Sequence, residues 1–198
     1  MTSRFKKQIE FLIEIDKVKN ILRMTSIADG TRRENDAEHS WSLAVMAILF
    51  AEYLPQELDL LKVIKMVLIH DLVEIYAGDT FAFDEAGMED KEERERLSAD
   101  KIFGILEEEQ NLELLTLWEE FEACQTQEAK YAAMLDRLQP LIMNYLNEGG
   151  TWAQHGVTLE QVYKRNQITL DHGPKEFIDF IHQVINECVE KGYIINNK

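Results

Sequence analysis

The stretch FKKQIEFLIEIDKVKNIL, residues 5–22, decides the predicted fold. Its apolar side chains recur at steps of three and four residues, a spacing that places them on one face of an α-helix. The residues with this spacing are Phe5, Ile9, Leu12, Ile13, Val18, Ile21 and Leu22. We therefore expect a helix over about 4–23 that buries this face, and we interpret the rest of the sequence outward from it.

Glycine and proline are rare in the chain, with nine and three residues among 198. They leave long uninterrupted blocks, whereas a sheet of several strands needs many more turn residues. No useful stretch alternates apolar and polar residues as a half-buried strand does. The predicted fold is therefore all-α, a single-domain helical bundle over residues 1–198. Further helices are expected near 37–53, 57–76, 88–109, 112–123, 126–148, 158–170 and 174–190.

Residues that favour helix ends flank several of these segments. Asn35 and Asp36 are suitable N-caps for the second helix, Pro55 closes it, and Gly78 is placed to end the third. The acidic segment DEAGMEDKEERER, residues 84–96, is interpreted as a loop and a solvated helix face, with a regulatory role as the weaker alternative.

The composition excludes some classes of partner. The chain has 37 acidic and 21 basic side chains, which gives a formal net charge of −16. Nucleic-acid polymers and anionic membranes are disfavoured, because a protein needs clustered cations to bind them. A small anion held by a metal ion remains compatible with this charge.

The cysteines and the apolar runs indicate where the protein works. Cys124 and Cys188 lie far apart and match no metal-binding or redox spacing. The first residues lack the apolar stretch of a signal peptide. The longest apolar run, residues 43–51, has nine residues, whereas a membrane span needs roughly 18. We therefore expect a cytoplasmic protein without a disulfide, an export signal or a membrane segment.

Ionisable residues interrupt an apolar helix in the block KMVLIHDLVEIYAGDT, residues 65–80. Buried charges are costly unless they are paired or bound to a metal ion. His70 and Glu74 share one helical face, and Asp71 is adjacent to it. Asp79 follows the expected helix end, where a loop can turn it back over that face. The alternative is a core histidine hydrogen-bonded to a neighbour, with the acidic side chains in solvent.

Two further ionisable residues lie on other apolar helices. His39 stands in the first turn of the helix in RRENDAEHSWSLAVMAILFA, residues 32–51, where a capping or packing role is the alternative. Asp136 lies at the edge of the apolar face in EAKYAAMLDRLQPLIMNYL, residues 128–146, where a surface ion pair is the alternative. Two histidines and two aspartates on three helices thus offer the ligands of a mononuclear metal site, suited to Zn²⁺, Mn²⁺, Co²⁺ or Fe²⁺.

The order His39, His70-Asp71, Asp136 resembles the H…HD…D signature of the HD-domain metal-dependent phosphohydrolases. The strings RENDAEHSW, HDLVEIYAGDT and LWEEFEACQTQEAKYAAMLDRLQP are similar to those of the 5′-deoxynucleotidase subfamily, which dephosphorylates deoxyribonucleoside 5′-monophosphates. The motif-bearing core covers about residues 20–145. The C-terminal helices at 158–190 carry no motif to which we can assign chemistry.

The resemblance implies a role for each matching residue. One divalent ion, Co, Mn, Zn, Fe or Mg, would have as its ligands His39, His70, Asp71 and Asp136. Glu74 and Asp79 would be the catalytic acidic residues beside the attacking water. Arg23 would orient the substrate phosphate, and Thr80 would adjoin the loop that contacts the substrate. Some relatives have tryptophan after that arginine, associated with preference for the deoxy sugar. This chain has Met24, which leaves the sugar preference open.

The expected function is hydrolysis of (deoxy)ribonucleoside 5′-monophosphates to nucleoside and phosphate. The alternatives are a catalytically silent module that binds metal or nucleotide, and an HD hydrolase of another nucleotide such as a guanosine polyphosphate. The presence of Glu74 and Asp79 beside four ligands favours an enzyme. The resemblance also implies a homodimer. Asp171-His172 repeats the HD pair, but the Gly173-Pro174 that follows is typical of a turn between helices.

Overall fold

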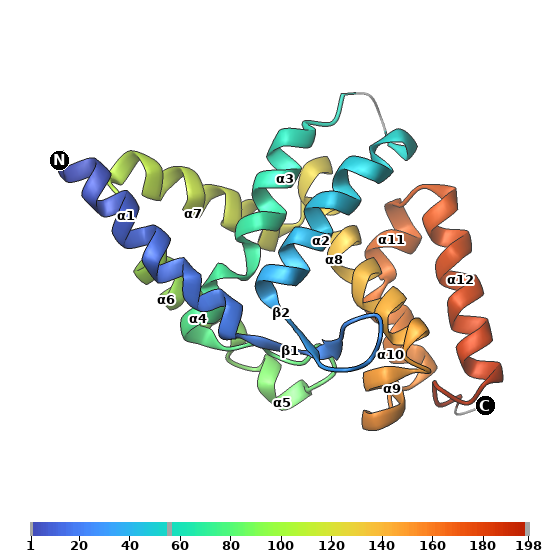
Figure 1. Ribbon diagram of the computed structural model, residues 1–198. Helices are drawn as coiled ribbons and strands as arrows, with labels where there is room; N and C mark the ends of the chain where they lie inside the picture. The colour runs from blue at the N-terminus through green and yellow to red at the C-terminus, as the bar shows by residue number, and fades with distance from the viewer. Residues whose placement is uncertain (1, 55–56, 197–198) are drawn as a thin grey trace.

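The computed structural model describes residues 2–54 and 57–196, and its architecture is almost wholly helical (Figure 1). The longer helices are α1 (Ser3–Ile15), α2 (Asp36–Leu49), α3 (Leu60–Ile69), α6 (Lys91–Phe103), α7 (Glu108–Ala123), α8 (Gln127–Leu146) and α12 (Lys175–Glu190). The shorter ones are α4 (Glu74–Ala77), α5 (Glu85–Met88), α9 (Gly150–His155), α10 (Leu159–Arg165), α11 (Gln167–His172) and the 3₁₀ helices η1 (Asp16–Asn20), η2 (Phe50–Tyr53) and η3 (His70–Val73). The all-α prediction is confirmed.

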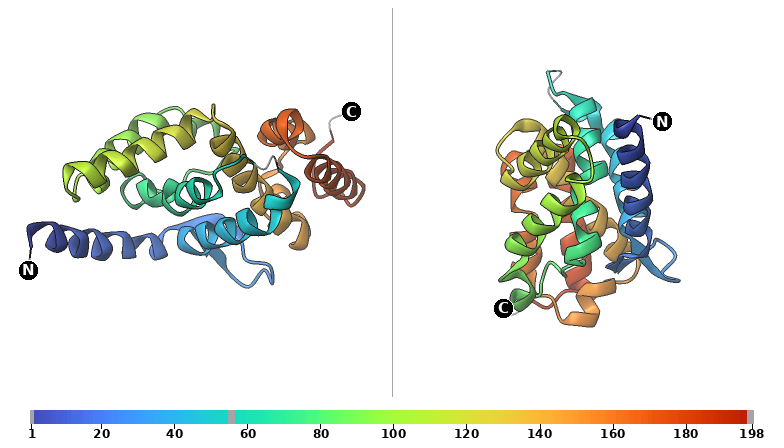
Figure 2. Two further views of the ribbon diagram at one scale, coloured as in Figure 1. Left: turned by 90° about the horizontal axis from the view of Figure 1, so that it is seen from above. Right: turned by 90° about the vertical axis from the view of Figure 1, so that its left-hand side faces the viewer.

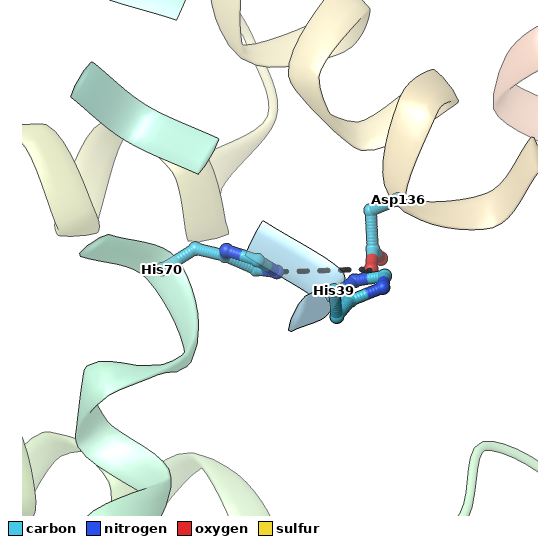
Figure 3. A group of neighbouring side chains, drawn as sticks. All are labelled: His39, His70 and Asp136. Carbon is cyan, nitrogen blue, oxygen red and sulfur yellow. Dashed lines mark hydrogen bonds and ion pairs between the residues drawn. The ribbon is translucent and has the colours of Figure 1, made fainter. Parts of the chain in front are cut away.

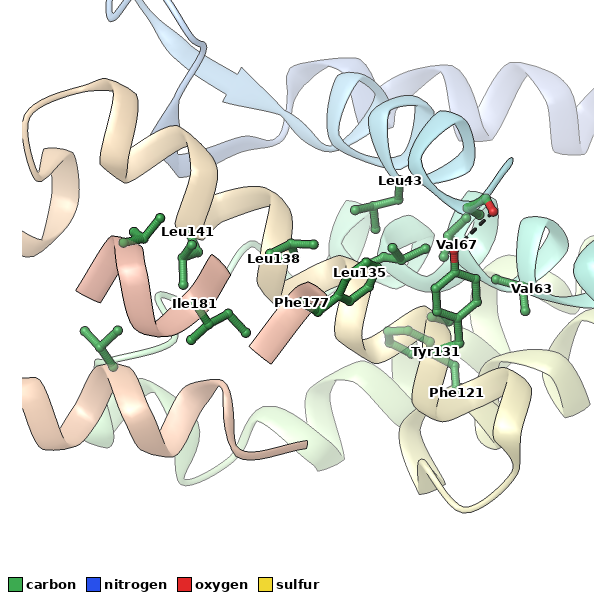
Figure 4. Close-up of a cluster of buried hydrophobic side chains, with 14 of the residues drawn as sticks. Leu43, Val63, Val67, Phe121, Tyr131, Leu135, Leu138, Leu141, Phe177 and Ile181 are labelled. Carbon is green, nitrogen blue, oxygen red and sulfur yellow. Dashed lines mark hydrogen bonds between the residues drawn. The ribbon is translucent and has the colours of Figure 1, made fainter. Parts of the chain in front are cut away.

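Helix α8 forms the centre of the bundle, and α2, α3, α7 and α12 pack around it. Its buried side chains continue from one end of the core to the other (Figure 4). Tyr131, near the start of α8, meets α2 by donating a hydrogen bond of 3.1 Å to the carbonyl oxygen of Ala47. Leu141, two turns from the other end, packs in the same cluster as Ile181 of α12. The C-terminal helices therefore share a core with the motif-bearing part.

The helix expected over 4–23 is shorter in the structure. Helix α1 ends at Ile15, η1 follows, and the chain then enters strand β1 (Leu22–Ser26), which pairs antiparallel with β2 (Arg33–Asn35). Residues 21–26 are not helical because their backbone groups form hydrogen bonds with the chain around β2. The amide of Asp36 donates to the carbonyl oxygen of Ile21 at 3.2 Å, and Leu22 pairs with Asn35.

The expected burial of the α1 apolar face was also wrong. Phe11 is buried, whereas four residues of the apolar spacing are exposed: Phe5, Ile9, Leu12 and Ile13. The cause is the position of α1, which extends along one edge of the molecule and packs on α6 (Figure 2). Figure 2 also shows α1 and α2 following one another along one side of the molecule.

Other helices were predicted in the right places with different bounds. The helix expected at 57–76 consists of α3, η3 and α4. The one expected at 88–109 corresponds to α6, which ends at Phe103, and residues 108–109 already belong to α7. Gly78 ends α4 as expected. Helix α9 was not predicted. Pro55 lies outside the described residues.

The acidic segment 84–96 covers α5 and the first part of α6, and most of it is exposed. Glu95 is the exception, since it is buried and lies 3.1 Å from the ammonium group of Lys91. Within residues 2–54 and 57–196, no helix is both long and apolar enough to cross a membrane.

Candidate metal centre

The start of α2 is fixed by a reciprocal cap that places His39 in its first turn. The amide of Glu38 donates to Asn35 Oδ1 at 3.0 Å, and the amide of Asn35 donates to Glu38 Oε2 at 3.2 Å. Such a pair satisfies two of the N–H groups that a helix N-terminus leaves free. Asn35 is thus the N-cap, whereas Asp36 is the first helical residue and is fully buried.

Three elements bring the four predicted ligands together. His39 comes from α2, His70 and Asp71 from η3, and Asp136 from α8, and all four are buried. His39 Nε2 lies 3.1 Å from Asp136 Oδ1, and His70 Nε2 lies 3.1 Å from Asp71 Oδ1. His70 Nε2 is also 3.8 Å from Asp136 Oδ1 (Figure 3). Asp71 Oδ2 is 4.0 Å from His39 Nε2, so it joins the same cluster.

Both imidazole rings are held from the side away from the cluster. His39 Nδ1 lies 3.2 Å from Gln139 Oε1, and Gln139 Nε2 donates to Glu34 Oε1 at 2.8 Å. His70 Nδ1 lies 3.0 Å from the carbonyl oxygen of Val67. Since both partners are acceptors, each Nδ1 carries the proton in the neutral ring. Each Nε2 lone pair is then free for a metal ion.

These residues fit a divalent metal ion. His70 Nε2 is a buried atom that lacks a hydrogen bond to any of the described residues. His39, His70 and Asp136 each offer one ligand atom within 4.8 Å of the others, and Asp71 lies beside them. Two imidazole nitrogens with two carboxylates form a donor set suited to Zn²⁺, Mn²⁺, Co²⁺ or Fe²⁺.

The cluster perturbs the acidity of its own members. Burial alone would lower the pKa of His70, but Asp71 and Asp136 outweigh it and raise the pKa to about 10. Burial opposes ionisation of Asp71 and Asp136 as well. Neighbouring groups hold the pKa of both carboxyls below its usual range: His70 and then Arg23 act on Asp71, and His39 and then His70 act on Asp136.

A second group of buried carboxyls adjoins the first. Asp36, Asp71 and Glu74 each place an oxygen within 4.8 Å of the others. Burial and then the charge of Asp71 raise the pKa of Asp36 to about 7 and raise the pKa of Glu74 well above its ordinary value. Glu74 thus lies next to the cluster, as expected, in an environment that favours a protonated carboxyl. Asp36 is a member of the site that the sequence suggested only as a helix cap.

Arg23 extends from β1 into this acidic cluster. Its Nη1 lies 2.6 Å from Asp71 Oδ2 and 3.5 Å from Asp36 Oδ1. Glu34 and Asp136 each have an oxygen 4.0 Å from the guanidinium. Burial opposes the charged form, yet these carboxylates raise the pKa of Arg23. Arg23 therefore compensates the negative charge of the cluster from inside the pocket.

Asp79 and Thr80 line the same pocket as the histidine and aspartate cluster. Gly78 turns the chain back after α4 with φ 79° and ψ 150°, a conformation that is almost confined to glycine. Burial raises the pKa of Asp79. The hydroxyl of Thr80 accepts a hydrogen bond of 3.2 Å from Arg94 Nη2, which fixes the loop against α6.

The C-terminal helices complete the pocket, although their sequence carried no recognisable motif. Trp152, Arg165 and Asn166 line it together with Arg23 and Met24 of β1. Arg165 Nη2 donates to Asp136 Oδ2 at 3.2 Å, and burial lowers the pKa of this arginine. Asn166 Oδ1 is buried and accepts no hydrogen bond from the described residues. In the sequence, these pocket residues could have been suspected only from the polar pair Arg165-Asn166. Such pairs are common on the exposed faces of helices.

The second HD pair lies apart from the cluster. Asp171 and His172 end α11, and both are exposed. The chain turns at Gly173, and α12 begins at Lys175. Pro174, which was expected as the first helical residue, is the N-cap of that helix. The interpretation of this pair as a turn between helices agrees with the structure.

Comparison with protein families gives one match. The model described as HD domain matches residues 15–177. A human protein named 5′-deoxynucleotidase HDDC2 is 28% identical over 135 residues, which are 68% of this chain and 65% of the human protein. A protein of the same name from Dictyostelium discoideum is 29% identical over 143 residues, 69% of this chain and 75% of that protein. The match thus spans slightly less than two thirds of the human relative's length.

Solved structures share the architecture. A protein from Magnetospirillum magnetotacticum, named a predicted metal-dependent phosphohydrolase, is 49% identical and superposes with a TM-score of 0.90, covering 97% of this chain and 96% of that one. A protein from Pyrococcus horikoshii is 23% identical, with a TM-score of 0.67 over 90% of this chain and 98% of its own. The second likeness concerns the fold alone.

Proposed function

The chain belongs to the HD domain family, and from this membership we propose that it is a metal-dependent phosphohydrolase acting on nucleoside 5′-monophosphates. The observation that carries the proposal is one pocket whose lining includes His70, Arg23 and four carboxyl groups, those of Asp71, Glu74, Asp79 and Asp136. The buried His39 adjoins it, with Nε2 3.1 Å from Asp136 Oδ1. A metal ion and an anionic substrate can meet there, although the chain as a whole is strongly acidic. The names of the curated relatives support a nucleotide as the substrate.

The proposed ligands are His39, His70, Asp71 and Asp136. When bound, a divalent ion supplies a Lewis acid for the phosphate oxygens and lowers the pKa of a water molecule that attacks phosphorus. The chain holds both imidazoles with Nε2 toward the cluster before any ion arrives, because Gln139 and Val67 accept from the opposite nitrogens. Such outer contacts orient metal ligands and raise their affinity.

Asp79 and Glu74 are proposed to handle the protons. Burial raises the pKa of both carboxyls, which favours the protonated form more than in an ordinary carboxyl and suits groups that accept and return a proton during turnover. Asp79 stands at the end of a loop and holds the attacking water, while Glu74 orients it from the floor of the pocket. The 5′-oxygen of the nucleoside leaves on the opposite side of phosphorus.

Arg23 and Thr80 are proposed to contact the substrate. Arg23 offers a planar guanidinium that can bind two phosphate oxygens at once. Thr80 lies in the loop that covers the pocket. Met24 lines the main pocket and also a second cavity, which it forms with Arg33 and Asp79. The shape of its side chain therefore affects the choice between ribose and deoxyribose.

The test is a panel of paired ribo- and deoxyribonucleoside 5′-monophosphates, incubated with the purified protein and Mn²⁺ or Co²⁺. Phosphate release from at least one monophosphate is the expected result. Release only from a guanosine polyphosphate favours the second hydrolase hypothesis. No release from any nucleotide, with metal still bound, favours the silent binding module.

The proposed assembly is a homodimer, which the exposed apolar residues of α1 and α2 support. Ile13 of α1 and Trp41 of α2 are each 66% exposed. The two helices follow one another along one side of the molecule (Figure 2). Sedimentation velocity should give twice the chain mass. Ile13→Glu should yield a monomer, whereas Ile195→Glu, a matched change of an exposed residue near the other terminus, should not. A cytoplasmic location is also proposed, and the two free cysteines support it.

A further inference from the structure

Arg165 occupies the outer side of the proposed metal cluster. It is the last residue of α10, its side chain is 33% exposed, and it lines the main pocket. Its Nη2 lies 3.2 Å from Asp136 Oδ2, whereas Asp136 Oδ1 faces the two histidines. The guanidinium therefore contacts a proposed ligand, Asp136, through the carboxylate oxygen other than the one that faces the histidines.

Arg23 and Arg165, two of the three arginines that line the pocket, differ in how far their charge is compensated. Arg23 has four carboxylates within 4.0 Å and is only 11% exposed. Arg165 has a single carboxylate, that of Asp136, within 4.0 Å among the described residues. A guanidinium carries five N–H donors, and Arg165 uses one of them toward the described part of the chain. Its remaining donors and much of its charge are available to a ligand.

The surroundings of Arg165 are basic. An adjoining cavity is lined by three cations, Arg165, Arg137 and Lys164, and by one carboxylate, Glu85. Arg137 Nη1 is 4.0 Å from Asp136 Oδ2, so two arginines share one carboxylate oxygen. Clustered cations attract anions and raise their local concentration. The positive charge is thus in excess beside Arg165, although the chain has a net charge of −16.

We propose that Arg165 binds the phosphate group of the substrate, a role that rests on the proposed function. The guanidinium holds Asp136 with one N–H and offers a fork of donors to two phosphate oxygens, as arginine does at phosphate sites. The C-terminal helices then supply a second phosphate contact, in addition to the one proposed for Arg23 of the motif-bearing core. A purely structural arginine would act only by positioning Asp136, and metal affinity would report that role.

The experiment compares four metal-loaded proteins: the unmodified chain, Arg165→Gln, Arg165→Lys and the control Lys175→Gln. Lys175 is the first residue of α12, is exposed, and lines neither the main pocket nor the cavity beside Arg165. Calorimetry measures binding of inorganic phosphate and of an unphosphorylated nucleoside. Elemental analysis gives bound metal per chain, and steady-state kinetics separates KM from kcat.

Arg165→Gln should weaken phosphate binding about tenfold or more, the size expected for losing a charge-assisted hydrogen bond. Nucleoside binding and metal content should stay unchanged, and the KM for a monophosphate should rise more than kcat falls. Arg165→Lys should recover part of the phosphate affinity, because it keeps the charge without the fork. Lys175→Gln should match the unmodified chain within about twofold, as surface changes do.

Phosphate binding by Arg165→Gln that equals that of the unmodified chain would overturn the proposal. So would a loss of phosphate binding that occurs only together with loss of metal in both Arg165 variants. If the unmodified chain releases no phosphate from any monophosphate, the proposed function fails. The comparison of phosphate affinities still decides the role of Arg165 in that case.

Discussion

Gln139 is the residue on which the orientation of His39 depends. Its amide accepts from His39 Nδ1 and donates to the buried carboxylate of Glu34. Gln139→Leu keeps a similar volume but removes both contacts, so the imidazole can rotate or change tautomer. We expect metal affinity to fall about 10- to 100-fold, as for other outer-shell partners of metal-bound histidines. Competition with a fluorescent chelator measures this change, and an unaltered affinity would exclude the role.

His70 makes metal binding depend on pH. In the metal-free protein its pKa is about 10, because Asp71 and Asp136 stabilise the imidazolium more than burial destabilises it. A ligand must lose its proton before it binds a metal ion, and rising pH removes that proton. We expect the affinity for Mn²⁺ to rise about tenfold per pH unit between pH 6 and 8, for one displaced proton. Titrations at three pH values test this, and a constant affinity would contradict it.

Substitutions of Asp71 and Asp79 should show which of the two side chains is needed for metal binding and which only for turnover. Asp71 contacts His70 and Arg23 inside the cluster, so Asp71→Ala should lose both bound metal and phosphate release. Asp79 lines the pocket from the loop, so Asp79→Ala should retain metal and lose about 10²- to 10⁴-fold in turnover, the usual contribution of a proton-transfer group. Metal analysis and phosphate release on both variants are sufficient. Full activity of Asp79→Ala would refute its assignment.

The sequence predicted the residues at the centre of the site better than those that support them. Ionisable residues are rare on apolar helices, which drew attention to His39, His70 and Asp136, and the resemblance to the H…HD…D signature then implied these three with Asp71 as ligands. Glu34 and Gln139 are 105 positions apart and bond only in the folded chain. Asp36 had a second plausible role as a helix cap, and only its complete burial places it in the acidic group. Local patterns carry no information about such long-range contacts.

At the scale of elements, the end of α4 sets the position of the loop that carries Asp79 and Thr80. Gly78 adopts φ 79° and ψ 150°, and a Cβ there would meet no described atom within 4 Å. Gly78→Ala therefore tests backbone conformation without a steric clash. We expect a stability loss of about 1–3 kcal/mol and, because Asp79 shifts, a turnover loss of up to about 100-fold. Chemical denaturation and kinetics measure the two effects.

The control for Gly78→Ala is Gly192→Ala. Gly192 has φ 74°, also has open space where a Cβ would be added, and follows α12 outside the residues that line the main pocket. Gly192→Ala should lower the free energy of unfolding by about as much as Gly78→Ala does, and its turnover should stay unchanged. Equal turnover losses in both variants would mean that Gly78 acts through general stability and not through Asp79.

The elements themselves were predicted well where a helix packs on neighbours along its whole length. Helix α8 was expected at 126–148 and occupies Gln127–Leu146, since its apolar face meets the core throughout. The N-terminal region was predicted less well. Its apolar spacing continues past Ile15, but backbone pairing with β2 overrides the helical preference there. A spacing rule also cannot tell whether an apolar face meets the core or a second chain.

At the scale of the whole molecule, the C-terminal helices and the motif-bearing core form one hydrophobic cluster. Phe177, Ile181 and Ile185 of α12 belong to the same cluster as Leu135 and Leu141 of α8. The pocket likewise draws residues from both parts. A chain built in this way should unfold as one cooperative unit, which is the content of the single-domain prediction for residues 1–198.

Ile181→Ala tests this cooperativity from a position remote from the metal ligands. Ile181 is fully buried, so the truncation should cost about 2–5 kcal/mol, and each kcal/mol should lower Tm by about 2–4 °C. Gln183→Ala, an exposed change on the same helix, should have little effect. Calorimetry should show one transition at the lowered temperature, with bound metal released in that same transition. A first transition that leaves the metal bound would divide the chain into two domains, because α12 would then unfold without the core it packs against.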